Sequence, residues 1–573
     1  MAPHRPVPTS HDERGIALVA AVLVVLLTSL LIAAFMTTTT GERALSSNVQ
    51  TAKVSLYAAD AGVRTVEQDL SNKAQAKYDS CVTAWNNAGS SGQIITSPST
   101  LFPSGTLSAQ TSSTPNFSST GSIAFSEDTV LATKQTYYYN YTVQSSGTVA
   151  STGTRRVQAQ GVIQLSAARG SFADYLMFMN VQQMSDGSDI WFTSNTSFDG
   201  RVHTNDIFHF AFKPTFQDLV TSVSPNAVFF NNGNQLTLNA NNNGSTDAPN
   251  FYNGFQRNQP SVAMPTNTWN QQEAAIGSPS VTTNPTTSAI NTALGVSGSS
   301  TPNGIYVVST AGNVTTTGAT GTMTGGIYVQ GDLTQATMWA DTVANRQWYQ
   351  LSQGSTYKTI MVDATAGQTK VWNSQYTTGT PNLVATGVPL GIMYVNGGIN
   401  DLTGPNRSNG NVLPAVAEGT KLFITAAKDI VIQGDVTLDS YNNNDNVLGL
   451  MSGYGGIRIG TSAPADVNVD AFIMAAATTS SFLSGWSSNY PGQFAVDSYD
   501  SGSPRGTMHL RGGVITQYYG AFGTFDSNSG NMVSGYARDF HYDRRGLIPP
   551  YFPQTTRFVT TAPVARTLAW KEI

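Results

Sequence analysis

The sequence predicts a mainly β protein with one long N-terminal α-helix and, in its larger part, an irregular β-solenoid. Three observations lead to this prediction. An uncharged apolar run extends from Ile16 to Met36. After it, apolar residues keep a helical period as far as about Tyr78. From about Ser171 to Pro553, short apolar runs are separated by Gly, Asn and Asp turns and show almost no helical period.

The composition is typical of an exported, β-rich protein. A chain of 573 residues is too long for one ordinary domain, so we expect about two or three. Charged residues make up only 11% and the net charge is −5, which gives no global indication of binding to nucleic acid or anionic membranes. The single cysteine, Cys81, excludes an internal disulfide. We expect a buried thiol there, with pairing to another chain as the alternative.

Residues 1–15 are expected to be a leader that is lost on processing, because they are proline-rich and lack periodicity. The apolar run begins directly after Gly15. At about 1.5 Å per residue, residues 16–36 span roughly 30 Å, the thickness of a bilayer's hydrocarbon core, and are the predicted transmembrane segment. One alternative is a secretory signal peptide, whose apolar region is usually about 7–15 residues long. A plain membrane anchor is the other.

The second half of this helix is predicted to be amphipathic. Its apolar positions alternate in steps of four and three, the narrow stripe of a helix that packs lengthwise against neighbours or a sheet. These positions are Leu45, Val49, Ala52, Leu56, Ala59, Val63, Val66 and Leu70. We therefore expect one helix from Ile16 to about Tyr78, roughly 90 Å long.

This N-terminal region resembles the PilX-type minor pilins. The resemblance covers roughly residues 12–75 and rests on Gly15, the apolar helix after it and the string Leu56–Val63. It implies that a prepilin peptidase cuts between Gly15 and Ile16 and that Ile16 becomes the methylated amino terminus. It also implies that the helix first anchors the subunit in the inner membrane and later packs with other pilins in a type IV pilus or pseudopilus.

Ala20 departs from the pattern of the major pilins, which carry a Glu at the fifth mature position. In that family the Glu is thought to neutralise the amino terminus of the adjacent subunit, and a buried charge is costly unless it is paired. Subunits without this Glu resemble those placed at the filament tip. Ala20 therefore indicates a minor pilin at or near the tip, and the alternative is a plain signal-anchor helix.

Residues 79–170 are expected to form the head of the pilin. Residues 79–121 are rich in Ser, Thr, Gly and Asn and are predicted to be a loop-dominated connector. Residues 135–143 and 155–165 are aromatic or β-branched on either side of a Gly-containing turn, which predicts an antiparallel hairpin. The resemblance to pilins implies that this sheet packs on the amphipathic half of the helix.

Residues 171–553 are predicted to form an extracellular β-solenoid. Five stretches share one form, in which a small residue separates two short β runs, and stacked coils of this kind bury a continuous core with few charges. They begin at Gly304, Gly326, Ile392, Ile430 and Met508. Their irregular spacing excludes a fixed-period array, and a β-sandwich array is the competing fold.

Three further elements are expected in the C-terminal part of the chain. Thr268–Ala275 and Ala340–Gln350 are predicted to be short helices that cover a solenoid face or lie in an insertion. Residues 554–573 alternate weakly and could return to the pilin sheet as its final strand. In that case the solenoid is an insertion in the pilin head.

The second part also resembles, more weakly, the extracellular region of certain oversized minor pilins. In some of these a β-solenoid is inserted in the pilin head and is linked to natural competence, the uptake of DNA at the pilus tip. The residues that carry this resemblance are Phe198–Asn205, Tyr542–Arg545 and Pro549–Pro553. It implies a role in surface or DNA binding.

A membrane-anchored β-helix enzyme acting on polysaccharide is the rival of a different class. Glycosidase chemistry needs two carboxylates that converge over a groove. The candidates are Asp332, Asp435, Asp439, Asp466 and Asp470. Each follows a turn, where Asp is favoured for structural reasons, and no zincin, nucleophile-elbow or P-loop string occurs. We therefore expect a protein that is not an enzyme and has no cofactor.

Candidate metal ligands are weak. His203 and His209 are six positions apart in a region whose pattern predicts β-strands. Two histidines without a third ligand are more typical of a structural role. Tyr441–Asn446 and Asp497–Asp500 offer oxygen ligands for Ca²⁺ but lack the spaced acidic pattern of a dedicated loop. Ca²⁺ is retained as a candidate ion, and no metal site is predicted.

The C-terminal segment is the candidate ligand-binding face. Guanidinium groups interleaved with aromatic rings are the composition of a nucleic-acid groove. The candidate residues are Arg505, Arg511, Arg538, His541, Tyr542, Arg544 and Arg545. Asp539 and Asp543 lie among them, so a salt-bridged cap of the solenoid is the alternative, and exposed aromatic residues could equally bind glycans.

Together these observations predict a minor pilin of a type IV pilus or pseudopilus, processed at Gly15, that displays a β-solenoid at or near the tip. Its expected partners are other pilins, the prepilin peptidase, the inner membrane before assembly and DNA or surface glycans afterwards. Besides the enzyme, the remaining alternative is a non-binding subunit that only primes filament assembly.

Overall fold

The structure is a computed structural model that describes residues 13–88, 105–111, 116–130, 134–149, 153–231, 234–244, 247–278, 284–312, 319–441, 445–480, 483, 485–526 and 532–573. The chain forms two compact units. Unit 1 comprises Met1–Arg169 and Arg557–Ile573, and unit 2 comprises Gly170–Thr556. The predicted leader, residues 1–15, lies almost entirely outside the described residues.

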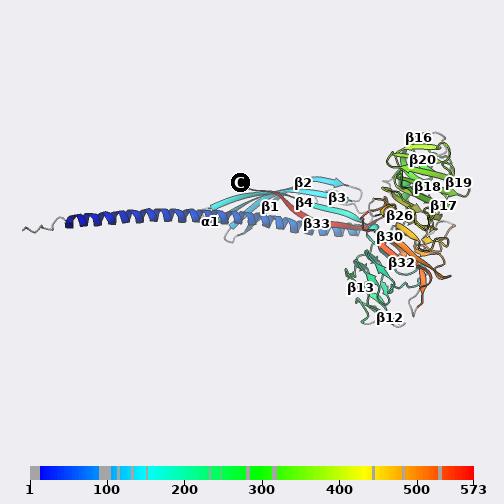
Figure 1. The fold of residues 1–573 in the computed structure, drawn as a ribbon, viewed down its shortest axis with the longest axis horizontal. Coiled ribbons are helices and arrows are strands. Elements are labelled where there is room, and N and C mark those ends of the chain that lie inside the picture. Colours follow the sequence, from blue (N-terminus) through cyan, green and yellow to red (C-terminus); the bar gives the residue numbers. More distant parts are fainter. Residues whose placement is uncertain are drawn as a thin grey trace, which may run out of the picture. The chain divides into compact units, whose positions relative to one another are not determined.

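Unit 1 consists of one long helix and a five-stranded sheet (Figure 1). Helix α1 spans Glu13–Ala88 without interruption. The strands are β1 (Gly105–Thr111), β2 (Asn116–Val130), β3 (Lys134–Val149), β4 (Gly153–Ser171) and β33 (Gln554–Glu572). Their order is β1-β2-β3-β4-β33, so the last strand of the chain lies beside β4.

The long N-terminal helix is confirmed, but its predicted end at about Tyr78 is wrong. Helix α1 continues to Ala88 because residues 79–88 contain neither Pro nor Gly. Their Ser, Thr and Asn residues lower helix propensity by only about 0.5 kcal/mol each. The prediction of a loop-dominated connector over residues 79–121 is therefore wrong for residues 79–88, which are helical. It is also wrong toward its end, where β1 and the beginning of β2 form strands, and residues 89–104 lie outside the described residues.

The predicted hairpin is confirmed. Strands β3 and β4 pair antiparallel, with Tyr139 opposite Ile163 and Val143 opposite Ala159. These four side chains are fully buried, and α1 packs on the same sheet. Among the residues of α1 whose burial is described, the buried ones are Ser55, Ala58, Ala59, Gly62, Val63, Val66 and Leu70. The apolar stripe and the alternating strands therefore meet in one core, as the two periodicities require.

A glycine lets the helix and the sheet of unit 1 approach each other closely. A Cβ atom at Gly147 on β3 would overlap the backbone of Ser55 and Ala59 on α1. Backbone atoms cannot move aside as a flexible side chain can, so only a residue without a Cβ fits at this contact.

Unit 2 is built on two ladders of parallel strands. The first contains β16 (Ala319–Gln330), β22 (Ile392–Asn396), β24 (Lys421–Ala426), β26 (Val447–Ser452), β28 (Asn468–Ala475), β30 (Pro504–Tyr518), β5 (Met177–Val181), β7 (Val202–Thr204), β10 (Val220–Ser222) and β14 (Phe255–Gln256). The second contains β17 (Gln335–Asp341), β23 (Ile399–Thr403), β25 (Ile430–Ile432), β27 (Ile457–Ile459) and β29 (Phe494–Val496).

Shorter elements extend the two ladders. Antiparallel strands are β15 (Gly304–Ser309), β18 (Arg346–Gln353), β19 (Thr356–Asp363), β20 (Gln368–Trp372), β21 (Leu383–Thr386), β31 (Gly523–Phe525) and β32 (Met532–Tyr542), the last of which also pairs parallel with β30. Two small sheets contain β8 (Phe208–Phe210), β11 (Ala227–Asn231), β12 (Asn234–Leu238), β6 (Ser197–Phe198), β9 (Thr215–Phe216) and β13 (Asn250–Phe251). The helices are η3 (Phe172–Asp174), α2 (Trp269–Ala275) and α3 (Thr287–Leu294).

The path of the chain brings an early and a late strand of unit 2 together. The chain enters the first ladder at β5 and continues through β7, β10 and β14. It then passes through α2 and α3 to β15 and β16 and returns strand by strand to β30. Strand β30 pairs with β5, with Val514 beside Met177. Segments more than three hundred positions apart in the sequence are therefore neighbours.

The core of unit 2 lies along these ladders. Its largest apolar cluster joins side chains from β5 and β7 to those of β16–β30, including Met177, Val202, Ile424 and Val514. All five stretches predicted as β runs lie in strands, on β15, β16, β22, β25 and β30. The mainly β fold class with one long N-terminal helix is thus confirmed, and the solenoid remains a prediction.

Of the two short helices predicted in this region, one is confirmed and one is wrong. Helix α2 covers Trp269–Ala275, as expected. Ala340–Gln350 instead forms the turn and flanking residues of an antiparallel hairpin between β17 and β18. Trp339 lies opposite Trp348 with the two rings 5.6 Å apart, and Asn345 takes a left-handed φ of 49° in the turn. Cross-strand ring packing outweighed the weak helical pattern.

Candidate functional site

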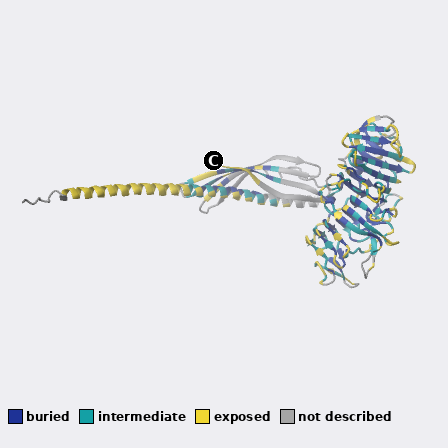
Figure 2. Cartoon of the chain, viewed as in Figure 1, coloured by how far each residue is buried: buried dark blue, intermediate teal, exposed yellow. Residues whose placement is uncertain are grey.

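The first candidate site is the N-terminal half of α1. Every described large apolar side chain from Ile16 to Met36 is between 52% and 72% exposed, so the whole circumference of the helix is apolar and uncovered (Figure 2). The helix is long and apolar enough to cross a membrane, with a mean hydropathy of 3.0 in its most apolar window. A helix that is apolar on all sides is stable only in lipid or among other apolar surfaces.

The predicted processing residues lie in the first turns of this helix. A Cβ atom at Gly15 would meet nothing within 4 Å, and Gly41, further along α1, has the same free surroundings. Glycine in a helix costs about 1 kcal/mol relative to alanine, so the fold gives no reason for Gly15. Ile16 and Ala20 are exposed on the apolar surface. Cleavage after Gly15 and the role of Ala20 remain predictions.

The amphipathic stripe of α1 is covered over only part of its length. Leu45 is 69% exposed, whereas Val63, on the same stripe, is 1% exposed beneath the sheet. Val49 is exposed as well. The stripe thus continues beyond the sheet of its own unit, where Leu45 and Val49 remain uncovered.

A polar network that joins α1 to β3 and β33 was not predicted from the sequence. Tyr141 donates a hydrogen bond of 2.8 Å to Glu67, and Thr567 donates one of 2.6 Å to the same oxygen. Trp570 donates its indole hydrogen to Asp60 at 3.0 Å. Burial raises the pKa of Tyr141 to about 12. These groups border a small cavity of about 230 Å³ lined by Leu56, Tyr57, Asp60, Val63, Arg64, Glu67, Thr567 and Trp570.

The predicted ligand-binding residues of unit 2 divide into several groups with internal partners. Arg545 pairs with the buried Asp543 at 2.7 Å. Arg511 and Arg545 both lie 4.1 Å from the ring centre of Tyr441. Burial raises the pKa of Asp543, but the hydrogen bonds from Arg545 outweigh it and hold that pKa below its usual range. These ion-pair and cation–π contacts engage both guanidinium groups within unit 2.

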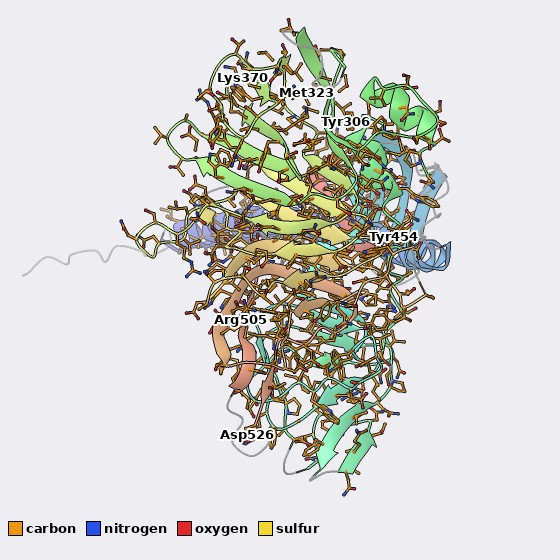
Figure 3. The ribbon with its side chains drawn as sticks, turned by 90° about the vertical axis from the view of Figure 1, so that its right-hand side faces the viewer. Tyr306, Met323, Lys370, Tyr454, Arg505 and Asp526 are labelled. Atoms are coloured by element: carbon orange, nitrogen blue, oxygen red, sulfur yellow. The ribbon has the colours of Figure 1, made fainter. Side chains whose placement is uncertain are left out.

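The other predicted arginines have partners elsewhere in unit 2. Arg505, which belongs to strand β30 and is labelled in Figure 3, donates to the backbone carbonyls of Gly460, Thr461 and Ala463. Arg538 contacts the hydroxyl of Tyr519, and burial lowers its pKa to about 10. These guanidinium groups are already occupied by internal acceptors.

His541, Tyr542 and Arg544 meet at Asp199. Both His541 Nδ1 and the backbone N–H of Tyr542 contact its carboxylate, at 3.0 and 2.7 Å. Arg544 donates to its carbonyl oxygen. His541 and Arg544 are exposed, as is Arg511. The structure therefore does not join all seven residues into one groove, and DNA binding remains a prediction.

The five aspartates considered for glycosidase chemistry also have partners within unit 2. Asp332 pairs with Lys428 at 3.1 Å, and Asp435 pairs with Arg407 at 2.6 Å. The remaining three accept hydrogen bonds: Asp439 from the adjacent Ser440, Asp466 from the Thr507 N–H, and Asp470, which lies within strand β28, from the Leu438 N–H. All five carboxylates are thus engaged by internal partners.

The candidate metal ligands do not gather. In the described part of the chain, no group of three or more His, Cys, Asp or Glu side chains is arranged to hold a metal ion. His203 lies on β7 and His209 on β8, which belong to different sheets. Asp497 pairs with Arg458 at 3.0 Å, Asp445 pairs with Lys421 at 2.9 Å, and residues 442–444 lie outside the described residues.

Comparison with known families gives two partial matches. Residues 14–64 match the family model described as PilX N-terminal. Residues 136–224 match a model described as a domain of unknown function, DUF4900. No match was found among curated proteins or among solved structures. The first match, together with the exposed apolar helix, supports a PilX-type pilin N-terminus related to type IV pili.

Proposed function

We propose that this chain is a minor pilin that is built into a type IV pilus or related pseudopilus through helix α1. A prepilin peptidase removes residues 1–15, and Ile16 becomes the methylated amino terminus. The helix anchors the subunit in the inner membrane before assembly and then packs among the helices of other pilins at the cell surface. The observation that carries this proposal is the exposed, uncharged surface from Ile16 to Met36, and the match of residues 14–64 agrees with it.

Leu45 and Val49 extend the surface available to neighbouring subunits. Their exposed side chains lie on α1 between its apolar half and the part that the sheet of unit 1 covers. Burial of apolar area against a second helix gains about 25 cal/mol per Å², so a neighbour that covers this strip stabilises the filament.

We place the subunit at or near the filament tip. Ala20 has no carboxylate that could pair with the amino terminus of the next subunit, and an unpaired buried charge is strongly unfavourable. A subunit with Ala20 can therefore join a filament, but it cannot neutralise the amino terminus of a subunit that follows it. This suits a terminal position or a role in priming assembly.

Unit 2 is proposed to be an irregular β-solenoid displayed by the pilin, with a binding rather than a catalytic role. The two parallel ladders and the core along them support the solenoid. The internal partners of the five aspartates favour binding over polysaccharide cleavage. DNA and surface glycans are the proposed ligands, and natural competence is the proposed process for DNA.

The processing step is tested with two matched glycine variants. Gly15→Leu and Gly41→Leu change exposed glycines of the same helix, and neither new side chain meets a neighbour at its Cβ. After co-expression with a prepilin peptidase, we expect Gly41→Leu to be processed to Ile16 and Gly15→Leu to keep its leader, as read by intact mass. Unprocessed wild type, or equal processing of both variants, would refute the proposal.

DNA binding is tested on the full chain in detergent with a duplex across a salt series. Arg544→Ala and His541→Ala change exposed side chains, whereas Arg545 is unsuitable because its loss removes the ion-pair partner of the buried Asp543. Contacts to phosphates predict binding that weakens steeply with salt and a shallower salt slope in Arg544→Ala. The absence of binding at low salt would exclude DNA as the ligand.

A further inference from the structure

Unit 2 contains a polar pocket that the proposed filament function does not use. Its volume is about 610 Å³, within the range of roughly 300–1,000 Å³ found for small-molecule sites. It lies where the end of β5, the start of β8 and the segment 261–263 meet. Its lining residues are Asn180, Val181, Gln183, Asn205, Asp206, Ile207, His209, Ser261, Val262 and Ala263.

Asn205 fixes the walls of this pocket. Its amide nitrogen donates to Asn180 Oδ1 and to the Val262 carbonyl, both at 2.7 Å. Its amide oxygen accepts from the Val262 N–H at 2.8 Å and contacts His203 Nε2 at 3.0 Å. One side chain thus ties all three walls together, so the pocket is already formed without a ligand, and binding does not have to order them.

The remaining polar groups of the wall combine donors and acceptors. Asn180 uses its oxygen for Asn205, which leaves its amide nitrogen as a donor. Gln183 donates to Asp189 at 2.8 Å, which leaves its amide oxygen as an acceptor. Asp206 accepts from the Gln182 N–H through Oδ2, which leaves Oδ1. Such a mixed set matches hydroxyl groups, because each hydroxyl both donates and accepts.

His209 forms part of the wall without adding a charge. The residue is only 5% exposed. Burial lowers the pKa of His209, which favours the neutral imidazole.

The charges of the wall narrow the ligand class. No Lys or Arg lines the pocket, and Asp206 supplies a carboxylate. A phosphate or carboxylate ligand would therefore lack a counter-charge and would be repelled. We propose that this pocket binds a neutral sugar, whose hydroxyl groups are held by Asn180, Gln183 and Asp206. The proposal is independent of filament assembly, so either can fail without the other.

The test uses the full chain in dodecylphosphocholine micelles, a detergent without a sugar headgroup. Glucose, galactose, mannose and N-acetylglucosamine are added at millimolar concentration and observed by saturation-transfer-difference NMR, with glucose 6-phosphate and spermidine as charged probes. We expect saturation transfer to at least one neutral sugar and none to the charged probes.

Three variants locate the site. Ala263→Trp fills the pocket without removing a polar group and is expected to abolish the signal. Asp206→Asn keeps the acceptor for Gln182 and is expected to weaken binding about tenfold, because hydrogen bonds to charged groups are worth about 1.5–3 kcal/mol. Asn400→Ser, at an exposed position on β23 outside the pocket, is the matched control and should bind as the wild type does. Equal thermal unfolding of all variants shows that the fold is intact.

Three outcomes would overturn the proposal. The first is that no neutral sugar receives more saturation transfer from the wild-type protein than from the Ala263→Trp variant. The second is a sugar signal that survives Ala263→Trp, since binding would then lie elsewhere. The third is competition by spermidine or glucose 6-phosphate at the same pocket, which would assign it to a charged ligand.

Discussion

The hydroxyl group of Thr555 donates a hydrogen bond of 3.0 Å to the carbonyl oxygen of Gly170. In the sequence, Gly170 is the first residue of unit 2 and Thr555 is the last but one. Next to this bond, the Phe172 N–H contacts the Pro553 carbonyl at 3.4 Å. These two hydrogen bonds bring the start and the end of the unit to the same place. A unit whose entry and exit are adjacent interrupts its host chain at a single point.

We expect residues 170–556 to fold when they are produced alone. Their apolar core and both ladders lie within this range, and the Thr555–Gly170 bond joins its ends. Circular dichroism should show one cooperative urea transition. In this fragment Thr555→Val should lower the free energy of unfolding by about 1 kcal/mol, because a buried hydrogen bond is lost. Thr356→Val, at an exposed strand position, should stay within about 0.5 kcal/mol of the wild type. A fragment without a cooperative transition would contradict this expectation.

Gly147→Ala should loosen α1 from the sheet of unit 1. The added methyl group overlaps the helix backbone at Ser55 and Ala59, and overpacking of this kind costs about 1–3 kcal/mol. Hydrogen exchange of the α1 amides near these residues should therefore be faster. Gly41→Ala is the control, since its methyl group enters open space and should stabilise the helix by up to about 1 kcal/mol. Equal exchange in both variants would show that the close approach is unimportant.

Leu27→Asp should impair membrane insertion. Leu27 lies near the middle of the uncharged run, where a carboxylate costs about 2.5–3.5 kcal/mol on insertion scales. Leu45→Asp makes the same change at a similarly exposed position beyond that run. Extraction of membranes with alkaline carbonate should release more of the Leu27→Asp protein than of the Leu45→Asp protein. Equal release would mean that the run does not anchor the chain.

Lys358 should make the stability of unit 2 depend on pH. Its ammonium group donates to Asn373 at 2.6 Å, and burial lowers the pKa of Lys358 to about 8. The pKa in the unfolded chain is about 10.4. Between these two values the unfolded state binds more protons, so stability rises with pH across this window and is lowest below about pH 8.

Lys358→Met should therefore stabilise the protein at pH 7 and lose this advantage near pH 10. One pKa unit corresponds to about 1.4 kcal/mol, and the lost bond to Asn373 offsets part of the gain, so we expect about 1–2 kcal/mol. Urea unfolding at both pH values measures the difference. Lys370→Met, on the neighbouring strand β20, is the matched control. A gain that is the same at pH 7 and pH 10 would rule out burial of the charge as its cause.

Local pattern was enough for some elements of this protein. Three elements could be predicted from the sequence: the uncharged run from Ile16, the apolar stripe through Val63 and the β3–β4 hairpin. This was possible because a helical or strand period repeats within a few residues. The end of α1 was misjudged, since Ser, Thr and Asn indicate loops only in the absence of a longer helix that continues through them. The β17–β18 hairpin was missed because the packing of Trp339 on Trp348 is a contact across strands.

The candidate binding residues show the same division. The sequence shows that Arg538, Arg544 and Arg545 lie in one basic segment. It does not show the different internal partners of these arginines, which keep them from forming one surface. Arg545 meets Asp543 and Tyr441, whereas Arg538 meets Tyr519. The pocket around Asn205 had no sequence signal, because Asn180 and Val262 are far from each other in the chain and meet only through that side chain.

The sequence by itself determined that a long helix, apolar and uncharged in its first half, precedes a mainly β chain. Tertiary structure alone decided which strands pair, where the arginines point and that the two ends of unit 2 meet. The physical reason is the range of the interactions. Helix and strand periods arise from the geometry of adjacent residues, whereas the pairing of Val514 with Met177 depends on the packing of the entire chain between them.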